Sequence, residues 1–456
     1  MKPASGAVPD LPGPAGGVGL ATAGALDAAW RRRLRQLGQV LGAQAVVQAL
    51  GFVVGLLWVR ALDPSAYALF TLAFSLAATC GALADAGLSS AVMAQAGRQG
   101  AAHQRFAVWA AARALQRPLW RWGPWLALPV MAWLLWTPAS AESGTGALGP
   151  VVAAMLALAF AALQLHNGPS QMLMRLAGDV AWQQRLDLLL AGLRLLATLV
   201  LIGGLGLLAL EPASPVGAWA GLLVHVVAAV VLAHALGHWL HARGLDPAAA
   251  ATQAPAHRRA LLAQMLQQGP NAVWFVVASQ ASLWLVAALG SSQQVAEVGA
   301  LSRLAGLFVM VGALVAVLAQ PHFARRHDRA ALWRSFLALQ GAFALLTVVL
   351  MALAVAAPGP VLKVLGPAYA GMSEELRWMT LAASLAAWSG AVYALGCARG
   401  WVLPLPWAVA CSLAGAALAA WCFDLGTVRG AFALNAFGAG LSLVAASALV
   451  ARRILR

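Results

Sequence analysis

Charged residues are scarce in this chain, and their scarcity excludes a soluble protein. Only 9% of the 456 residues are charged, whereas 62% are hydrophobic and the mean hydropathy is +0.80. A soluble domain has about 25% charged residues. Because a soluble core could not bury so much apolar side chain, we expect an all-α, polytopic membrane protein.

Cysteine is also rare, and the patterns that build metal sites or catalytic centres are missing. The four cysteines lie in apolar runs without metal-ligand spacing. His225, His234, His238 and His241 follow one another at irregular spacing with no carboxylate near them. No nucleophile–base pair, paired catalytic carboxylates or phosphate-binding glycine loop stands out. We therefore expect no metal, no cofactor and no enzyme activity.

Long apolar runs are what the sequence has in abundance. A bilayer core of about 30 Å needs about 20 apolar residues per helix. The runs predict about twelve spans, at residues 37–59, 67–93, 122–138, 150–173, 186–210, 216–240, 266–289, 297–319, 336–357, 377–397, 402–423 and 430–451.

The basic residues are spread unevenly over the predicted loops. With the N-terminus in the cytoplasm, most of the 29 Lys and Arg residues fall in inner segments, as the positive-inside rule requires. Both termini are therefore expected to be cytoplasmic. This distribution accounts for the net charge of +15 without a nucleic-acid partner. The basic, aromatic inner loop 95–122 predicts an interfacial amphipathic helix.

A weak internal repeat suggests how the chain is organised. Residues 42–46 (GAQAV) align with residues 269–273 (GPNAV), so the first and seventh spans correspond. Two hydrophobic halves can also look alike by chance. A parallel repeat would place two bundles around a pseudo-twofold axis along the membrane normal. The predicted organisation is a disordered cytoplasmic tail (1–26), an N-terminal six-helix bundle (27–245), a cytoplasmic linker (246–265) and a C-terminal six-helix bundle (266–456).

Ionisable residues inside the spans are candidates for function, because they are costly in a membrane. Arg194 lies too deep in its span to reach the interface easily, so it binds an anion or pairs with an acid such as Asp85. Arg303 lies nearer the outer face and could equally be structural. Asp85, in "GALADAGLSS", either carries a coupling proton or neutralises an arginine.

Uncharged polar residues form a second group of candidates. Gln44 lies in the first span and Asn271 in the seventh, each within a polar stripe. His166 and Asn167 precede Gly168-Pro169, which predicts a polar break in the fourth span. Such residues either line a hydrophilic cavity or let helices pack closely.

Two loop motifs carry a resemblance to a known family. The sequence resembles Wzx-type polysaccharide flippases of the multidrug/oligosaccharidyl-lipid/polysaccharide exporter superfamily. The residues that match are Arg60, Leu62, Pro64, Tyr67, Asp85, Gly87 and Leu88 in the first half, and Leu365, Gly366, Pro367 and Tyr369 in the second.

The resemblance implies a V-shaped transporter of two six-helix bundles in the bacterial inner membrane. It implies a monomer that flips an undecaprenyl-diphosphate-linked oligosaccharide, such as an O-antigen or lipopolysaccharide unit, with other polysaccharide-assembly proteins as partners. Coupling to H⁺ or Na⁺ is left open. The alternatives are a cation or drug antiporter of the same superfamily, or a membrane enzyme acting on lipid-linked sugars.

Arg60 has two readings. It sits at the predicted outer edge of the first span, near enough to Asp63 to pair with it, so a membrane-edge anchor would explain it. The other reading places it at the outer mouth of a substrate path. We therefore expect Arg194, Arg303 and Arg60 to bind substrate together with Gln44, Asn271, His166 and Asn167, and Asp85 to couple an ion.

Overall fold

The computed structural model describes residues 23–97, 104–116, 118, 148–177, 179–207, 215–243, 254–314, 319, 323, 328–397, 399, 401 and 403–455. The regular elements among these residues are all helical. The chain divides into a short unit, Met1–Gln44, and a large unit, Ala45–Arg456. The helices are α1 (Ala23–Ala61), α2 (Pro64–Asp85), α3 (Leu88–Gly97), α6 (Leu148–Leu176), α7 (Val180–Leu207), α8 (Pro215–Ala242), α10 (Ala254–Leu289), α11 (Ser292–Leu314), α13 (Arg329–Ala356), α14 (Pro358–Leu365), η2 (Pro367–Tyr369), α15 (Ser373–Cys397), α16 (Leu405–Cys422) and α17 (Val428–Leu455). A further helical segment covers residues 104–116.

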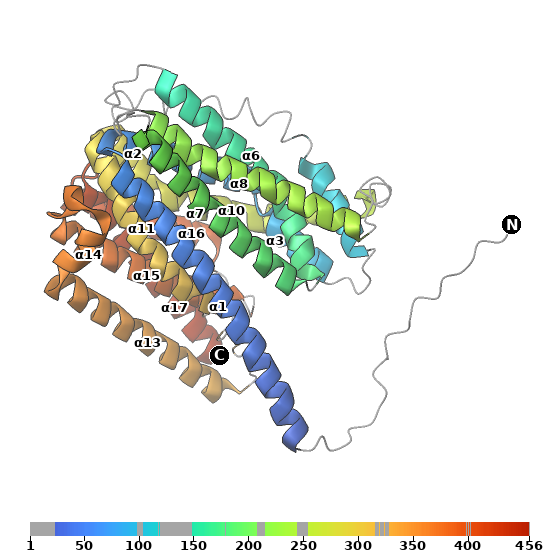
Figure 1. Cartoon of the computed structure of the whole chain (residues 1–456). Helices are drawn as coiled ribbons and strands as arrows, with labels where there is room; N and C mark the ends of the chain where they lie inside the picture. The colour runs from blue at the N-terminus through green and yellow to red at the C-terminus, as the bar shows by residue number, and fades with distance from the viewer. Residues whose placement is uncertain are drawn as a thin grey trace. The chain divides into compact units, whose positions relative to one another are not determined.

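Most of the predicted spans coincide with helices (Figure 1). Among the described residues, 10 helices are long and apolar enough to cross a membrane, and each overlaps a predicted span. The predicted span 297–319 corresponds to α11, which has 23 residues but is not among those 10. The predicted span 122–138 and residues 1–22 of the predicted tail lie outside the described residues. Helix α10 begins inside the predicted linker, and the domain boundaries stay predictions.

The second predicted span, 67–93, extends too far, because the helix that it predicts, α2, ends at Asp85. Ala86 and Gly87 adopt φ values of 39° and 80°, and α3 starts after them. Gly87 makes this turn accessible, since glycine has no Cβ to clash at positive φ. The carboxylate of Asp85 then accepts hydrogen bonds from Ser89 N at 3.2 Å and Ser89 Oγ at 2.6 Å. Because apolar residues lie on both sides of the turn, the sequence pattern did not predict it.

The interfacial helix predicted in 95–122 is also wrong for the part that the structure describes. Phe106, Trp109 and Leu115 of the segment 104–116 are at most 8% exposed and belong to a core with α3, α6 and α8. Trp109 Nε1 donates to Ser170 Oγ of α6 at 3.2 Å. The segment therefore packs inside the protein, and its basic residues Arg105 and Arg113 donate to the carbonyls of Leu176 and His166 in α6.

The predicted break before Pro169 does not occur, because α6 continues through the proline. Proline lacks an N–H, so the carbonyl four residues earlier loses its helical donor. That carbonyl belongs to Leu165, and Gln116 Nε2 donates to it at 2.7 Å. A side chain from the segment 104–116 thus supplies the missing hydrogen bond. Pro270 likewise lies inside the continuous helix α10.

Helix α2 contacts helices from both early and late parts of the chain. Its buried side chains belong to one core with residues of α8, α11 and α15. Gly299 of α11 touches it closely, since a Cβ at Gly299 would lie 2.6 Å from Thr71 Oγ1. Ser75 Oγ donates to Gln280 Oε1 of α10 at 2.6 Å. Small and hydroxyl residues allow such close helix contacts in membranes.

We predict that Gly299→Leu destabilises the protein by separating α2 from α11. Forcing extra side-chain atoms into a filled core costs about 1–3 kcal/mol, so the melting temperature in detergent should fall. The control is Gly306→Leu on the same helix, where a Cβ would meet nothing within 4 Å. Equal melting temperatures for the two variants would contradict the prediction.

Candidate functional site

Arg303 of α11 is held between α1 and α2. Its Nε donates to Tyr67 Oη at 3.1 Å, and its Cζ lies 5.7 Å from the ring centroids of both Phe70 and Phe74. On α1, a Cβ at Gly55 would lie 3.1 Å from Arg303 Cδ, so a larger residue there would crowd the arginine. The two terminal nitrogens have no hydrogen-bond partner among the described residues and stay available to a ligand.

Arg194 of α7 is mostly surrounded by protein. Its Nε is buried and has no hydrogen-bond partner among the described residues. Asp187, two turns earlier on α7, interacts with it electrostatically but forms no direct ion pair with it. Arginine keeps its charge in proteins, so Arg194 brings a positive charge without a bonded counter-ion.

His225 of α8 lies among aromatic rings. Its ring centroid is 5.1 Å from that of Phe74, 5.8 Å from that of Phe160 and 6.2 Å from that of Phe70. The Nδ1 lies 2.9 Å from the carbonyl oxygen of Gly221. A carbonyl only accepts, so Nδ1 carries the proton and Nε2 of the neutral ring is an acceptor.

These three side chains form what we call the cationic cluster: Arg194, His225 and Arg303. His225 interacts electrostatically with both arginines, although the three residues come from three different helices. All three side chains remain partly exposed. The buried rings beside them lower the local dielectric, which strengthens their attraction for an anion.

The two arginines of this cluster were predicted from the sequence as substrate-binding residues, whereas His225 was not. It treated His225 as one of four irregularly spaced histidines, whereas His234 is exposed and bonds only Val230 O of its own helix. The available signal was position: His225 lies in the middle of a 28-residue apolar helix, and its three companions lie closer to the helix end.

Arg60 has a different place from the two arginines of the cationic cluster. Its Nε donates to Val364 O at 3.0 Å and its Nη2 to Lys363 O at 2.9 Å. These carbonyls end α14, where helices lack internal donors. The expected Arg60–Asp63 pair is not formed, because Asp63 accepts from Ser65 N and Ala66 N as the N-cap of α2.

Asp85 does not pair with Arg194. Its carboxylate bonds Ser89 at the start of α3, as described above. The predicted pairing of Arg194 with Asp85 is therefore wrong. The ion-coupling role stays a prediction, and the hydrogen bonds give the same carboxylate a structural role in the turn.

His166 and Asn167 connect α6 to its neighbours. The Arg113 guanidinium lies 2.9 Å from His166 Nδ1 and 3.0 Å from Nε2, and it donates to the His166 carbonyl at 2.8 Å. Asn167 is 1% exposed and donates to Ala229 O of α8 at 3.0 Å. Arg113 was read as a cytoplasmic loop residue, and only the fold reveals this contact.

Gln44 and Asn271 gain no partner in the described structure. Gln44 is exposed, Asn271 is partly buried, and neither makes a hydrogen bond to another described residue. The described residues also contain no group of three or more His, Cys, Asp or Glu side chains that could hold a metal ion. The structure thus brings together Arg194 and Arg303 from the predicted set and disperses the others.

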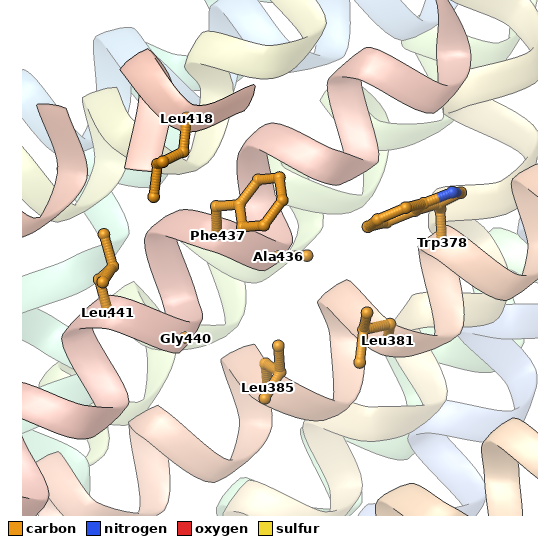
Figure 2. Close-up of a pocket in the computed structure, with 8 residues that line it drawn as sticks. All are labelled: Trp378, Leu381, Leu385, Leu418, Ala436, Phe437, Gly440 and Leu441. Atoms are coloured by element: carbon orange, nitrogen blue, oxygen red, sulfur yellow. The ribbon is translucent and has the colours of Figure 1, made fainter. Parts of the chain in front are cut away.

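A separate apolar cavity lies in the second half, between α15, α16 and α17. Its volume is about 270 Å³. Figure 2 shows its eight lining residues, Trp378, Leu381, Leu385, Leu418, Ala436, Phe437, Gly440 and Leu441. None of them is charged, so this cavity offers nothing to a charged headgroup.

Solved structures match this chain over nearly its whole length. An inward-facing multidrug resistance MATE family transporter of the MOP superfamily has a TM-score of 0.64 and 17% sequence identity, covering 90% of this chain and 94% of that one. The outward-facing conformation of such a transporter has a TM-score of 0.53 and 16% identity, covering 91% and 94%. A eukaryotic MATE transporter, AtDTX14, has a TM-score of 0.55 and 11% identity, covering 92% and 96%.

These matches show the fold of the chain. No protein-family model and no curated protein matches the sequence. At these low identities, a structural match does not carry a substrate or a mechanism with it. The all-α, two-bundle transporter fold expected from the sequence is confirmed, and the chain is a multi-pass membrane protein with the fold of MATE transporters.

We predict that Arg60→Ala loosens α14. A hydrogen bond from a charged group contributes about 1.5–3 kcal/mol when shielded, and less at this exposed position, so amide exchange in residues 358–369 should speed up severalfold. Hydrogen–deuterium exchange measures this rate. Lys363→Ala is the control, because Arg60 bonds the Lys363 carbonyl and not its side chain. Unchanged exchange in Arg60→Ala would refute the role.

Proposed function

We propose that this protein flips a diphosphate-linked glycolipid from the inner to the outer leaflet of the bacterial plasma membrane. The observation that carries the proposal is the cationic cluster. Arg194 and Arg303 lie on membrane-type helices and form no ion pair with a carboxylate of the described residues, and His225 interacts with both. The resemblance of the loop motifs to polysaccharide flippases and the transporter fold support the same reading.

The chemistry of the headgroup fits the cluster. A diphosphate is doubly charged and expensive to desolvate, so it needs fixed cationic donors along its path. Guanidinium groups bind phosphate through two parallel hydrogen bonds and never lose their charge. The free terminal nitrogens of Arg303 offer such a fork. A polyprenyl tail has no polar groups and can stay in the lipid.

A cation or drug antiporter is the second candidate, because the structural neighbours include multidrug transporters. The residues in the cluster speak against it. An organic cation would meet two fixed positive charges, and Arg303 already lies over Phe70 and Phe74. The rings that would attract a cation therefore have an occupant from the protein itself.

The third candidate function is an enzyme that acts on lipid-linked sugars. The adjacent acids Glu374 and Glu375, in the first turn of α15, both pair with Arg429, at 3.1 Å and 2.7 Å. This pairing accounts for them without catalysis. We expect a monomer with both termini in the cytoplasm and no cofactor, driven by H⁺, Na⁺ or the substrate gradient, next to other polysaccharide-assembly proteins.

We predict that Arg194→Ala and Arg303→Ala each reduce flipping tenfold or more, because each removes a charge that offsets the phosphates. The measurement is surface polysaccharide in a flippase-deficient strain, at matched protein level. Arg303→Lys should fall between wild type and alanine, since it keeps the charge and loses the fork.

The control for this series is Arg334→Ala. Arg334 is exposed, and its hydrogen bond stays within its own helix, to Ala330 O. Full activity in Arg194→Ala and Arg303→Ala would refute the proposal. Purified protein that binds a lipophilic cation and ignores a polyprenyl diphospho-sugar would establish the antiporter instead.

We also predict that Asp85→Asn removes the dependence of transport on a pH gradient if Asp85 carries the coupling proton. Ser89→Ala separates this role from the structural one, because it deletes the Oγ donor and keeps the carboxylate. Transport in proteoliposomes with imposed gradients measures both variants. A coupling role requires loss in Asp85→Asn alone, and equal effects in the two variants would assign Asp85 to the turn.

A further inference from the structure

His225 is the titratable member of the cationic cluster, and its bonding leaves one ring nitrogen free. The Nδ1–H is committed to the carbonyl of Gly221 at 2.9 Å. The Nε2 has no hydrogen-bond partner among the described residues. A proton that binds His225 therefore binds at Nε2, and it creates a third positive charge next to Arg194 and Arg303.

In the part of the chain that the structure describes, no carboxylate interacts with His225 to balance that proton. Helix α2 contributes Phe70 and Phe74, and α6 contributes Phe160. Helix α7 contributes Arg194 and α11 contributes Arg303.

Two further ionisable groups interact with the arginines. Tyr67 of α2 accepts a hydrogen bond from Arg303 Nε. Asp187 of α7 interacts with Arg194 and Arg175, and no interaction joins it to His225. In the empty site, His225 therefore has two like charges beside it, those of Arg194 and Arg303.

We propose that His225 takes up a proton when an anionic phosphate headgroup binds the two arginines, so that proton and anion bind cooperatively. This proposal rests on the proposed function. The anion offsets the arginine charges and turns the surroundings of Nε2 from repulsive to attractive. The proton comes from solvent to Nε2 on binding and returns to solvent on release.

The linkage has a fixed sign. If the anion favours protonation of His225, protonation must favour the anion by the same factor. Affinity for the headgroup therefore rises as pH falls. An acidic outer solution would then hold the headgroup on the protein and slow its release. Protonation of His225 would thus strengthen headgroup binding at low pH. In an antiporter, by contrast, proton and substrate compete for binding.

The test measures headgroup affinity against pH with the full chain purified in detergent. The probe is a short-chain prenyl diphospho-hexose. One phosphate is esterified to the prenyl chain and the other to the hexose, so the diphosphate keeps the same charge from pH 8 to pH 5.5. Wild type should bind about tenfold more tightly at pH 5.5 than at pH 8. His225→Asn should lose this difference.

The control for this test is His234→Asn. His234 lies on the same helix and makes the same Nδ1 contact to the carbonyl four residues earlier, Val230 O, at 3.0 Å, but it is exposed. This variant should keep the wild-type pH dependence. His225→Phe, which matches the aromatic surroundings, repeats the test if the asparagine variant does not fold.

A second measurement detects the proton directly. Calorimetry of probe binding at pH 6.5, in buffers of different ionisation enthalpy, should show proton uptake by wild type and by His234→Asn, and none by His225→Asn. If wild type binds the probe with no uptake and no pH dependence, or if His225→Asn keeps both, the inference is overturned and the proposed function stands. If wild type does not bind the probe at either pH, the proposed function fails as well.

Discussion

Holding guanidinium groups within a bundle of apolar helices is the constraint on which the rest of this structure depends. A charged side chain at the centre of a bilayer costs about 2.5–3.5 kcal/mol even by the mildest scales. The fold reduces this cost for Arg303 with the Tyr67 hydroxyl and the faces of Phe70 and Phe74. Gly55 leaves the room that the side chain needs. Among the described residues, Arg194 Nε is left without a hydrogen-bond partner.

The same requirement to satisfy polar groups shapes the helices around the cluster. Where Pro169 removes a donor, Gln116 replaces it, and where α2 ends at Asp85, Ser89 and the carboxylate close the turn. In a membrane, backbone groups cannot fall back on water. At both of these irregularities a side chain from a neighbouring turn or segment makes the missing contact.

The fold class could be predicted from the sequence because it depends on composition and on the length of apolar runs. The ten spans, Arg194 and Arg303 followed from those rules. The wrong predictions fell where the composition of a segment does not indicate its structure. The turn at Ala86-Gly87 lies in an apolar run, and the segment 104–116 looks basic although its residues are buried. His225 was missed because its partners come from α2, α6, α7 and α11, and a pattern along one helix cannot reveal them.

The sequence by itself determined that this is a multi-pass helical membrane protein, where most of its helices run and which arginines are costly to hold there. These properties are local, since each follows from the apolarity of about 20 consecutive residues. Only the tertiary structure decided what each polar group touches. It assigned Arg60 to the end of α14, Asp85 to a turn and Arg113 to α6, and it joined Arg194, His225 and Arg303 in one cluster. The physical reason is that charge and hydrogen bonding act between side chains that chain order separates and packing brings together.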